Sequence, residues 1–150
     1  MDLFIYYKLD FALLFARMVL GILFFMQGYD KIFGLGLKRT EQGVEAAMRE
    51  TKIPSPLVKG ITLTSSFIEL FGGMLLIVGF LIYPALTILG FDLLVVVFAM
   101  SLREPLWDMR FVWPRLVLVL ALLLLPPSCD RFSLDHVFHF YESNPLISGS

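Results

Sequence analysis

Four long apolar runs are the feature that most restricts how this chain can fold. They cover about residues 11–29, 57–78, 80–102 and 106–125. A helix needs roughly 17–25 mostly apolar residues to cross the hydrocarbon core of a bilayer. The runs lack the polar–apolar alternation of a barrel wall, and lipid accepts only helices or closed barrels. We therefore expect an all-α integral membrane protein, a four-helix bundle of up-down antiparallel topology.

The composition agrees with a chain that lives in lipid. Hydrophobic residues make up 58% of the 150 residues and charged residues 17%, whereas roughly a quarter of a soluble domain is normally charged. Residues 1–150 are expected to form a single membrane domain. The formal net charge of −1 does not suit nucleic-acid binding, which needs clustered lysine and arginine.

The segments between the runs predict the connections. The second and third runs are barely separated, and Gly79 offers a helix stop, so these two helices are expected to form a tight antiparallel hairpin. The first connection is long and polar, but Val44, Ala47 and Met48 recur in it at i, i+3 and i+4. This spacing predicts a short amphipathic helix at the membrane interface. Residues 128–150 are expected to form a polar C-terminal tail.

The distribution of lysine and arginine predicts the orientation. The first and third loops, with the adjoining helix ends, hold Lys31, Lys38, Arg39, Arg49, Lys52, Lys59, Arg103 and Arg110. The opposite side holds only Lys8 and Arg131. The positive-inside rule then places loops one and three in the cytoplasm and both termini outside. Lys31, Trp107 and Trp113 are expected at the membrane interface.

Four ionisable residues fall within the apolar runs and form a candidate intramembrane polar site: Arg17, Glu69, Asp92 and Arg115. An unpaired charge at the bilayer centre costs at least about 2.5–3.5 kcal/mol, so such residues are usually paired and functional. Here two acids can balance two bases. We expect the set either to relay protons, to hold an anionic or quinone headgroup, or to lock the helices together.

Small residues indicate which helix faces pack together. On the first helix, Gly21 and Gly28 share one face. On the second helix, Gly72 and Gly73 belong to the same small-and-polar stripe as Glu69. Small residues let helix backbones approach closely inside lipid. We therefore expect these four glycines at helix contacts and Glu69 inside the bundle rather than facing lipid.

No cofactor set is evident in this chain alone. The single cysteine, Cys129, excludes an internal disulfide and a CxxC redox pair. His136 and His139 are spaced i, i+3, but no third ligand accompanies them, so no metal site is expected. No histidine lies inside an apolar run, which argues against a membrane haem held by this chain alone. No residue is assigned a catalytic role.

Three stretches resemble the DoxX family of small four-helix membrane proteins. They are "ARMVLGILFFMQGYDKIFG" at residues 16–34, "FIELFGGMLLIVGF" at residues 67–80, and the end of the long loop, "KIPSPLVKG", at residues 52–60. The resemblance covers about residues 11–125. The positions that match the family pattern are Arg17, Gly28, Lys31, Glu69, Gly72 and Gly73. Asp92 is not matched, and the chain has no cysteine pair.

The resemblance implies an integral subunit of a bacterial oxidoreductase or respiratory complex, because the family takes its name from a membrane subunit of thiosulfate:quinone oxidoreductase. The location implied is the inner (cytoplasmic) membrane, with redox subunits and lipids as partners. In this hypothesis Arg17, Glu69 and Asp92 contribute a quinone or proton site, and the chain is not catalytic alone. Two alternatives stay open: a structural or assembly protein whose buried charges only fix helix packing, or a small transporter.

Overall fold

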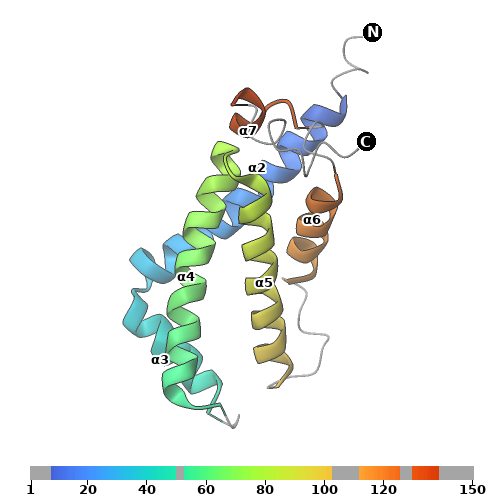
Figure 1. Cartoon of the computed structure of the whole chain (residues 1–150). Helices are drawn as coiled ribbons and strands as arrows, with labels where there is room; N and C mark the ends of the chain where they lie inside the picture. The colour runs from blue at the N-terminus through green and yellow to red at the C-terminus, as the bar shows by residue number, and fades with distance from the viewer. Residues whose placement is uncertain (1–7, 50–52, 103–111, 126–129, 139–150) are drawn as a thin grey trace.

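A computed structural model describes residues 8–49, 53–102, 112–125 and 130–138 (Figure 1). The elements are α2 (Lys8–Tyr29), the π-helix η1 (Asp30–Gly34), α3 (Leu37–Ala47), α4 (Ser55–Val78), α5 (Ile82–Ser101), α6 (Val112–Leu124) and α7 (Leu134–Val137). Every element in these ranges is helical, as the apolar runs predict.

Three of the described helices are long and apolar enough to cross a membrane. They cover Lys8–Gly34, Ser55–Val78 and Ile82–Ala99. Their length and composition agree with the predicted multi-pass membrane protein. The fourth apolar helix, α6, has 13 residues and is shorter than a span needs. The predicted fourth span began at residue 106, and its first turns, with Trp107, lie outside the described residues, so the four-span up-down arrangement stays a prediction.

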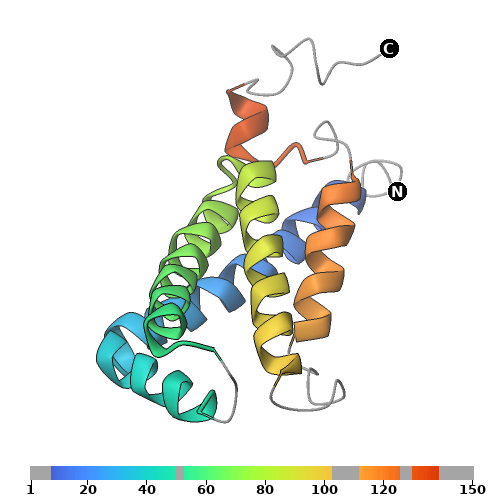
Figure 2. The ribbon, with the colours of Figure 1, turned by 60° about the horizontal axis from the view of Figure 1, so that its bottom comes forward.

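The helices are arranged around α4 and α5, which run side by side as a hairpin (Figure 1). α2 crosses behind this pair at a marked angle, α6 lies along the other side of α5, and α3 packs beside the first half of α4 (Figure 2). The fully buried apolar side chains lie where these helices meet: Leu20, Phe24, Leu76, Leu86, Leu89 and Val119. Helix packing in lipid depends on this van der Waals contact, since lipid tails are as apolar as leucine.

α2 and α4 approach so closely that glycine is required on both sides. A Cβ at Gly28 would lie 2.8 Å from the Cα of Leu70, and one at Gly73 would lie 2.8 Å from the Cα of Phe25. Real Cβ atoms do not come this near to backbone. Gly21 also lies at the α2–α4 contact. These glycines therefore set the distance between α2, which η1 with Lys31 continues, and α4, which carries Glu69.

The turn between α4 and α5 is as short as the sequence predicts. Gly79 ends α4 in the left-handed region, with φ +78°, and its N–H donates to the Leu75 carbonyl at 2.9 Å. Leu81 also has a positive φ, +51°, which is unfavourable for a side chain with a Cβ. Such a backbone persists only when surrounding contacts hold it, and those contacts come from the C-terminal segment.

A helix occupies the first connection, although it begins earlier than the apolar spacing indicates. α3 starts at Leu37, and Glu45 on this helix accepts a hydrogen bond from Ser55 and forms an ion pair with Lys59 at 3.3 Å. The Ser55 hydroxyl, together with the Lys59 ammonium, lowers the pKa of Glu45 below its ordinary value. These contacts join α3 to the start of α4.

Candidate functional site

The buried polar side chains form two groups at different levels of the helix bundle. The Glu69 cluster consists of Lys31, Ser65, Glu69, Asp92 and Arg115. The Arg17 cluster consists of Arg17, Asp130 and Asp135. On α4 the two are separated by the seven residues from Glu69 to Leu76, which corresponds to roughly 10 Å along a helix axis.

Glu69 lies in the middle of α4 with 2% of its surface exposed. The Lys31 ammonium donates to its Oε2 at 2.6 Å, and the lysine side chain is 23% exposed. A charge-assisted bond of this length is among the stronger hydrogen bonds in proteins. Lys31 belongs to η1, the π-helical turn that continues α2, and π-turns within helices occur frequently at functional sites. Glu69 therefore points into the bundle and is paired.

Asp92 on α5 is the second buried carboxylate, with 5% of its surface exposed. The Ser65 hydroxyl donates to its Oδ2 at 3.1 Å. The neighbouring hydroxyls of Thr62 and Ser66 instead donate to carbonyls of their own helix. Ser65 is therefore the hydroxyl of this polar stripe that α4 directs at α5. The charge of Lys31 acts on both Asp92 and Glu69, so the two carboxylates share one electrostatic environment.

Arg115 joins the Glu69 cluster from α6. Its guanidinium lies over the Phe24 ring, 5.8 Å from the centroid, and its charge acts on Glu69. The Arg115 Nε and the Gln27 Oε1 are both buried without a hydrogen-bond partner among the described residues. Buried polar atoms in native proteins are nearly always partnered. The cluster thus holds two acids, two bases and hydrogen-bonding capacity that this part of the chain leaves unused.

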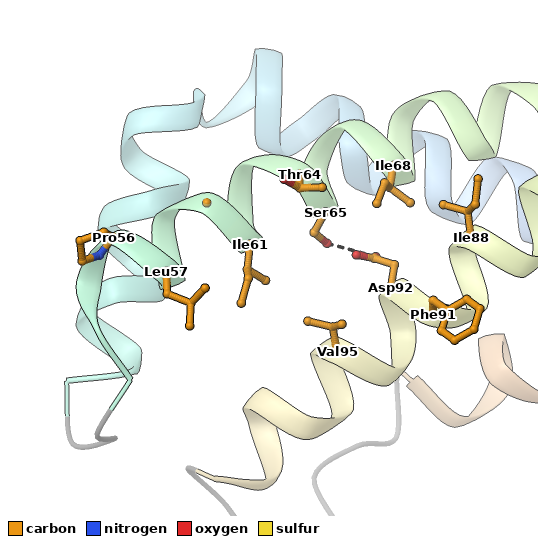
Figure 3. A pocket seen from close by; sticks show the side chains of 11 residues that line it. Pro56, Leu57, Ile61, Thr64, Ser65, Ile68, Ile88, Phe91, Asp92 and Val95 are labelled. Atoms are coloured by element: carbon orange, nitrogen blue, oxygen red, sulfur yellow. Dashed lines mark hydrogen bonds between the residues drawn. The ribbon is translucent and has the colours of Figure 1, made fainter.

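An apolar groove between α4 and α5 reaches the Glu69 cluster at Asp92. Its volume is about 460 Å³, and its walls include Leu57, Ile61, Phe91 and Val95. Ser65 and Asp92 point toward one another between the two helices within this groove, and Ile68 and Ile88 lie beyond them toward the α4–α5 turn (Figure 3). The groove is open along its side and apolar apart from this pair and Thr64. Its shape and chemistry suit an amphiphile with an apolar chain and a small polar head.

The Arg17 cluster has a different construction. Arg17 is 1% exposed, and its guanidinium donates to the Leu76 carbonyl at 2.7 Å and to the Phe132 carbonyl at 3.1 Å. Its Nε lies 3.1 Å from the Oδ2 of Asp130. A Cβ at Gly79 would lie 3.0 Å from the Arg17 Cζ, so the guanidinium fills the space beside the α4–α5 turn. Arg17 therefore joins α2, α4 and the C-terminal segment.

Asp135 completes this cluster by holding the strained turn. Its Oδ1 accepts from the Leu81 N–H and its Oδ2 from the Ile82 N–H, each at 2.8 Å. The Asp135 N–H donates in return to the Gly79 carbonyl at 3.1 Å. These bonds satisfy the first amides of α5, as a capping carboxylate does, and they secure Leu81 in its left-handed conformation. Residues 130–138 of the tail, which was predicted only to be polar, are thus docked over the α4–α5 turn.

The structure divides the four predicted intramembrane charges. Glu69 interacts electrostatically with both Asp92 and Arg115, and Lys31 is an added member that acts on both carboxylates. Arg17 instead contacts the tail and the end of α4. The expected balance of two acids against two bases did not include Lys31 as the direct partner of Glu69 or Asp130 as that of Arg17.

Other predicted positions are distributed as follows. Gly72 lies against Leu89 of α5, and Trp113 is 57% exposed on α6. Among the described residues, no group of three or more histidine, cysteine and acidic side chains is arranged to hold a metal ion. His139 and Cys129 lie outside the described ranges.

Sequence reasoning missed Asp130 and Asp135 as partners of buried groups. Both lie beyond the last apolar run, where acidic residues are normally solvated. The available signal was Arg17 itself, because an arginine inside an apolar run needs an acidic partner. Glu69 and Asp92 belong to the other cluster, and the acid that pairs with Arg17 is Asp130.

Comparison with known proteins gives one match. A family model described as DoxX matches residues 12–102. Searches of curated proteins and of solved structures gave no match. The matched range includes Lys31, Ser65, Glu69 and Asp92 with both walls of the α4–α5 groove, and it ends before α6 and the docked tail.

Proposed function

This chain belongs to the DoxX family, and from that premise we propose that it is an integral membrane subunit of a bacterial oxidoreductase complex that contributes a quinone site. In this proposal the redox centres belong to partner subunits. The chain supplies the helices and the groove that receive a lipid-soluble electron carrier from the membrane.

The observation that carries the proposal is the Ser65–Asp92 pair within the apolar α4–α5 groove. An isoprenoid quinone combines a long apolar chain with a head that carries two hydrogen-bonding oxygens. The groove offers apolar walls for the chain and the Ser65–Asp92 pair for the head. Its volume of about 460 Å³ lies within the roughly 300–1,000 Å³ typical of small-molecule sites.

The remainder of the Glu69 cluster suits proton handling beside such a head. A bound quinone supplies two-electron chemistry that is coupled to protons. Asp92 faces the head position, whereas Glu69 and Lys31 lie behind it as a buried ion pair whose lysine is partly exposed. When two titratable groups interact closely, a proton can reside on either of them. We propose that Asp92 and Glu69 carry protons between the groove and the end of the bundle at Lys31.

The proposal is tested on the complex isolated from native membranes through an affinity tag. A subunit should copurify with redox proteins and with extractable quinone. Gly60 lines the groove and has nothing within 4 Å of an added Cβ, so Gly60→Phe should fill the groove without disturbing helix contacts. We expect an assembled complex with little bound quinone and little quinone-linked turnover.

The matched control is Gly43→Phe. Gly43 on α3 also has nothing within 4 Å of an added Cβ, but it does not line the groove. This variant should keep both quinone and turnover. A protein that purifies alone, without redox partners or quinone, contradicts the proposal.

A structural or assembly role is the second candidate, and the Arg17 cluster favours it. Arg17 is fully enclosed by protein groups from three segments, which is the arrangement of a packing lock. If the Glu69 cluster serves the same purpose, Asp92→Asn should lower the amount of assembled complex while each assembled complex keeps its normal turnover. The quinone proposal instead expects a normal amount of assembled complex with lower quinone-linked turnover.

A further inference from the structure

The head-binding end of the α4–α5 groove offers hydrogen-bond acceptors in excess of donors. We infer that the groove selects amphiphiles whose head carries a hydroxyl donor over those whose head carries only a carbonyl acceptor. This inference rests on the proposed function in one respect, namely that the groove is a ligand site. For a quinone carrier it means that the site favours the reduced, hydroxyl-bearing form.

The number of available donors supports this selectivity. A serine hydroxyl has one proton to donate, and Ser65 gives it to the Oδ2 of Asp92. That is the one hydrogen bond that the described part of the chain supplies to the Asp92 carboxylate. Thr64 also lines the groove, but its hydroxyl both donates and accepts, so it does not discriminate between heads. The remaining lone pairs belong to Asp92 and to the Ser65 oxygen.

The charge of Asp92 supports this selectivity as well. The Glu69 cluster holds two bases, Lys31 and Arg115, and two acids, Glu69 and Asp92. With all four ionised the cluster is neutral, which is the arrangement that costs least in a membrane interior. An ionised carboxylate accepts hydrogen bonds and donates none. A hydroxyl head therefore satisfies a lone pair of Asp92, whereas a carbonyl head sets two acceptors against each other.

The direction of the groove also favours this placement of a ligand. Ser65 and Asp92 lie within the groove, with Ile68 and Ile88 beyond them toward the α4–α5 turn, and the longer stretch of apolar wall continues past Ile61 and Val95 to Leu57 near the start of α4 (Figure 3). A single apolar chain placed along these walls leaves its head at the carboxylate. The open side of the groove gives the chain access from lipid.

The size of the expected preference follows from the bond at stake. A hydrogen bond to a charged group that is otherwise left unmade changes affinity by roughly 10- to 100-fold. The measurement uses the purified full-length protein in nanodiscs and two pairs of probes. One pair is a decyl-substituted benzoquinol and its benzoquinone, and the other is farnesol and farnesal, which share a chain and differ at the head.

We expect the hydroxyl member of each pair to bind at least about tenfold more tightly to the unmodified protein. Asp92→Asn introduces an amide donor and should abolish or reverse the preference. Ser65→Ala removes the competing donor and should leave the preference intact or larger, which provides a second variant if Asp92→Asn is poorly folded. Gly60→Phe should abolish binding of all four probes, and Gly43→Phe should change nothing.

Equal affinity for both members of each pair, or preference for the carbonyl member, overturns the inference. The two pairs also separate its failure from that of the proposed function. If farnesol binds in preference to farnesal and neither benzoquinone form binds, the head selectivity stands and the quinone proposal fails. If both benzoquinone forms bind equally, the quinone proposal stands and the inference fails.

Discussion

The two buried polar clusters contain similar residues but differ in what surrounds them. In the Arg17 cluster the guanidinium is surrounded by the Leu76 and Phe132 carbonyls and by Asp130. Both clusters contain buried atoms that have no hydrogen-bond partner among the described residues: Arg17 Nε and Asp130 Oδ1 in the first, and Arg115 Nε in the second. In the Glu69 cluster, however, Asp92 also meets a groove. Enclosure of the guanidinium in one cluster and contact with a groove in the other fit the proposed roles of a structural lock and a binding site.

The difference follows from where each cluster draws its partners. Arg17 draws them largely from backbone carbonyls, which cannot change protonation and hold one geometry. The Glu69 cluster draws them mainly from titratable side chains on η1, α4, α5 and α6, which can change charge or hydrogen-bond direction. We therefore expect substitutions in the first cluster to act on folding and those in the second to act on binding.

The largest effect is expected from Arg17→Leu. The substitution leaves Asp130 and two carbonyls buried without their donor, and breaking one partner of a buried pair costs about 3–5 kcal/mol. We expect a steep fall in yield and in the unfolding midpoint of the detergent-solubilised protein. Arg17→Lys keeps the charge but not the three-way geometry, so it should recover only part of the loss. A leucine variant of normal stability would show that Arg17 is not a lock.

Asp135→Ala should have the next largest effect. It removes the acceptor of the Leu81 and Ile82 amides, and each buried amide left unsatisfied costs about 1–3 kcal/mol. It also releases the backbone strain at Leu81. We expect a lower unfolding midpoint and faster hydrogen exchange at the α4–α5 turn. Asp135→Asn retains one acceptor oxygen and should lie between the two. Unchanged exchange at the turn would mean that the tail does not hold it.

Breaking the Lys31–Glu69 pair should have a smaller effect. Lys31→Met leaves Glu69 buried without its donor, for which we expect a loss of about 1–3 kcal/mol, since Lys31 is itself partly exposed. Glu69→Gln should cost less, because its amide remains hydrogen-bonded. The double variant, measured in a mutant cycle by thermal unfolding, should be more stable than the sum of single losses predicts. Strictly additive losses would show that Lys31 and Glu69 do not interact directly.

The sequence was sufficient for the parts of the fold that depend on local pattern. Hydropathy located α2, α4 and α5 to within a few residues, and the left-handed Gly79 marked the turn between α4 and α5. The small-and-polar stripe correctly turned Glu69 inward, because the cost of exposing a carboxylate to lipid decides its direction.

The parts that depend on distant contacts could not be predicted in the same way. Arg17 meets Asp130 across 113 residues of sequence, and no periodicity links them. Lys31 was expected at the interface, and the π-turn that brings it to Glu69 has no clear sequence signal. The groove depends on how far α4 and α5 separate beyond Ser65, which is a property of packing rather than of either helix alone.

The smallest effect, and the finest test of the lock, is the response of the docked tail to pH. Burial raises the pKa of Asp130, and the nearby carboxylates of Asp10 and Asp135 raise it further, while the Arg17 charge lowers it. The net pKa is above the ordinary value, so the docked tail binds protons more readily than the free tail. Docking should therefore be complete at acidic pH and weaken as the pH rises through the pKa of docked Asp130.

Hydrogen exchange of residues 130–138, corrected for intrinsic rates, measures this response. Each unit by which the docked pKa exceeds the free value corresponds to about a tenfold change in the docking equilibrium, so exchange should be slower in acid than at alkaline pH. Asp130→Asn mimics the protonated form, and we expect it to protect the tail at every pH. If the asparagine variant exchanges faster than the unmodified protein, then the ionised pair is what holds the tail, and the lock depends on charge rather than on enclosure by neutral carbonyls.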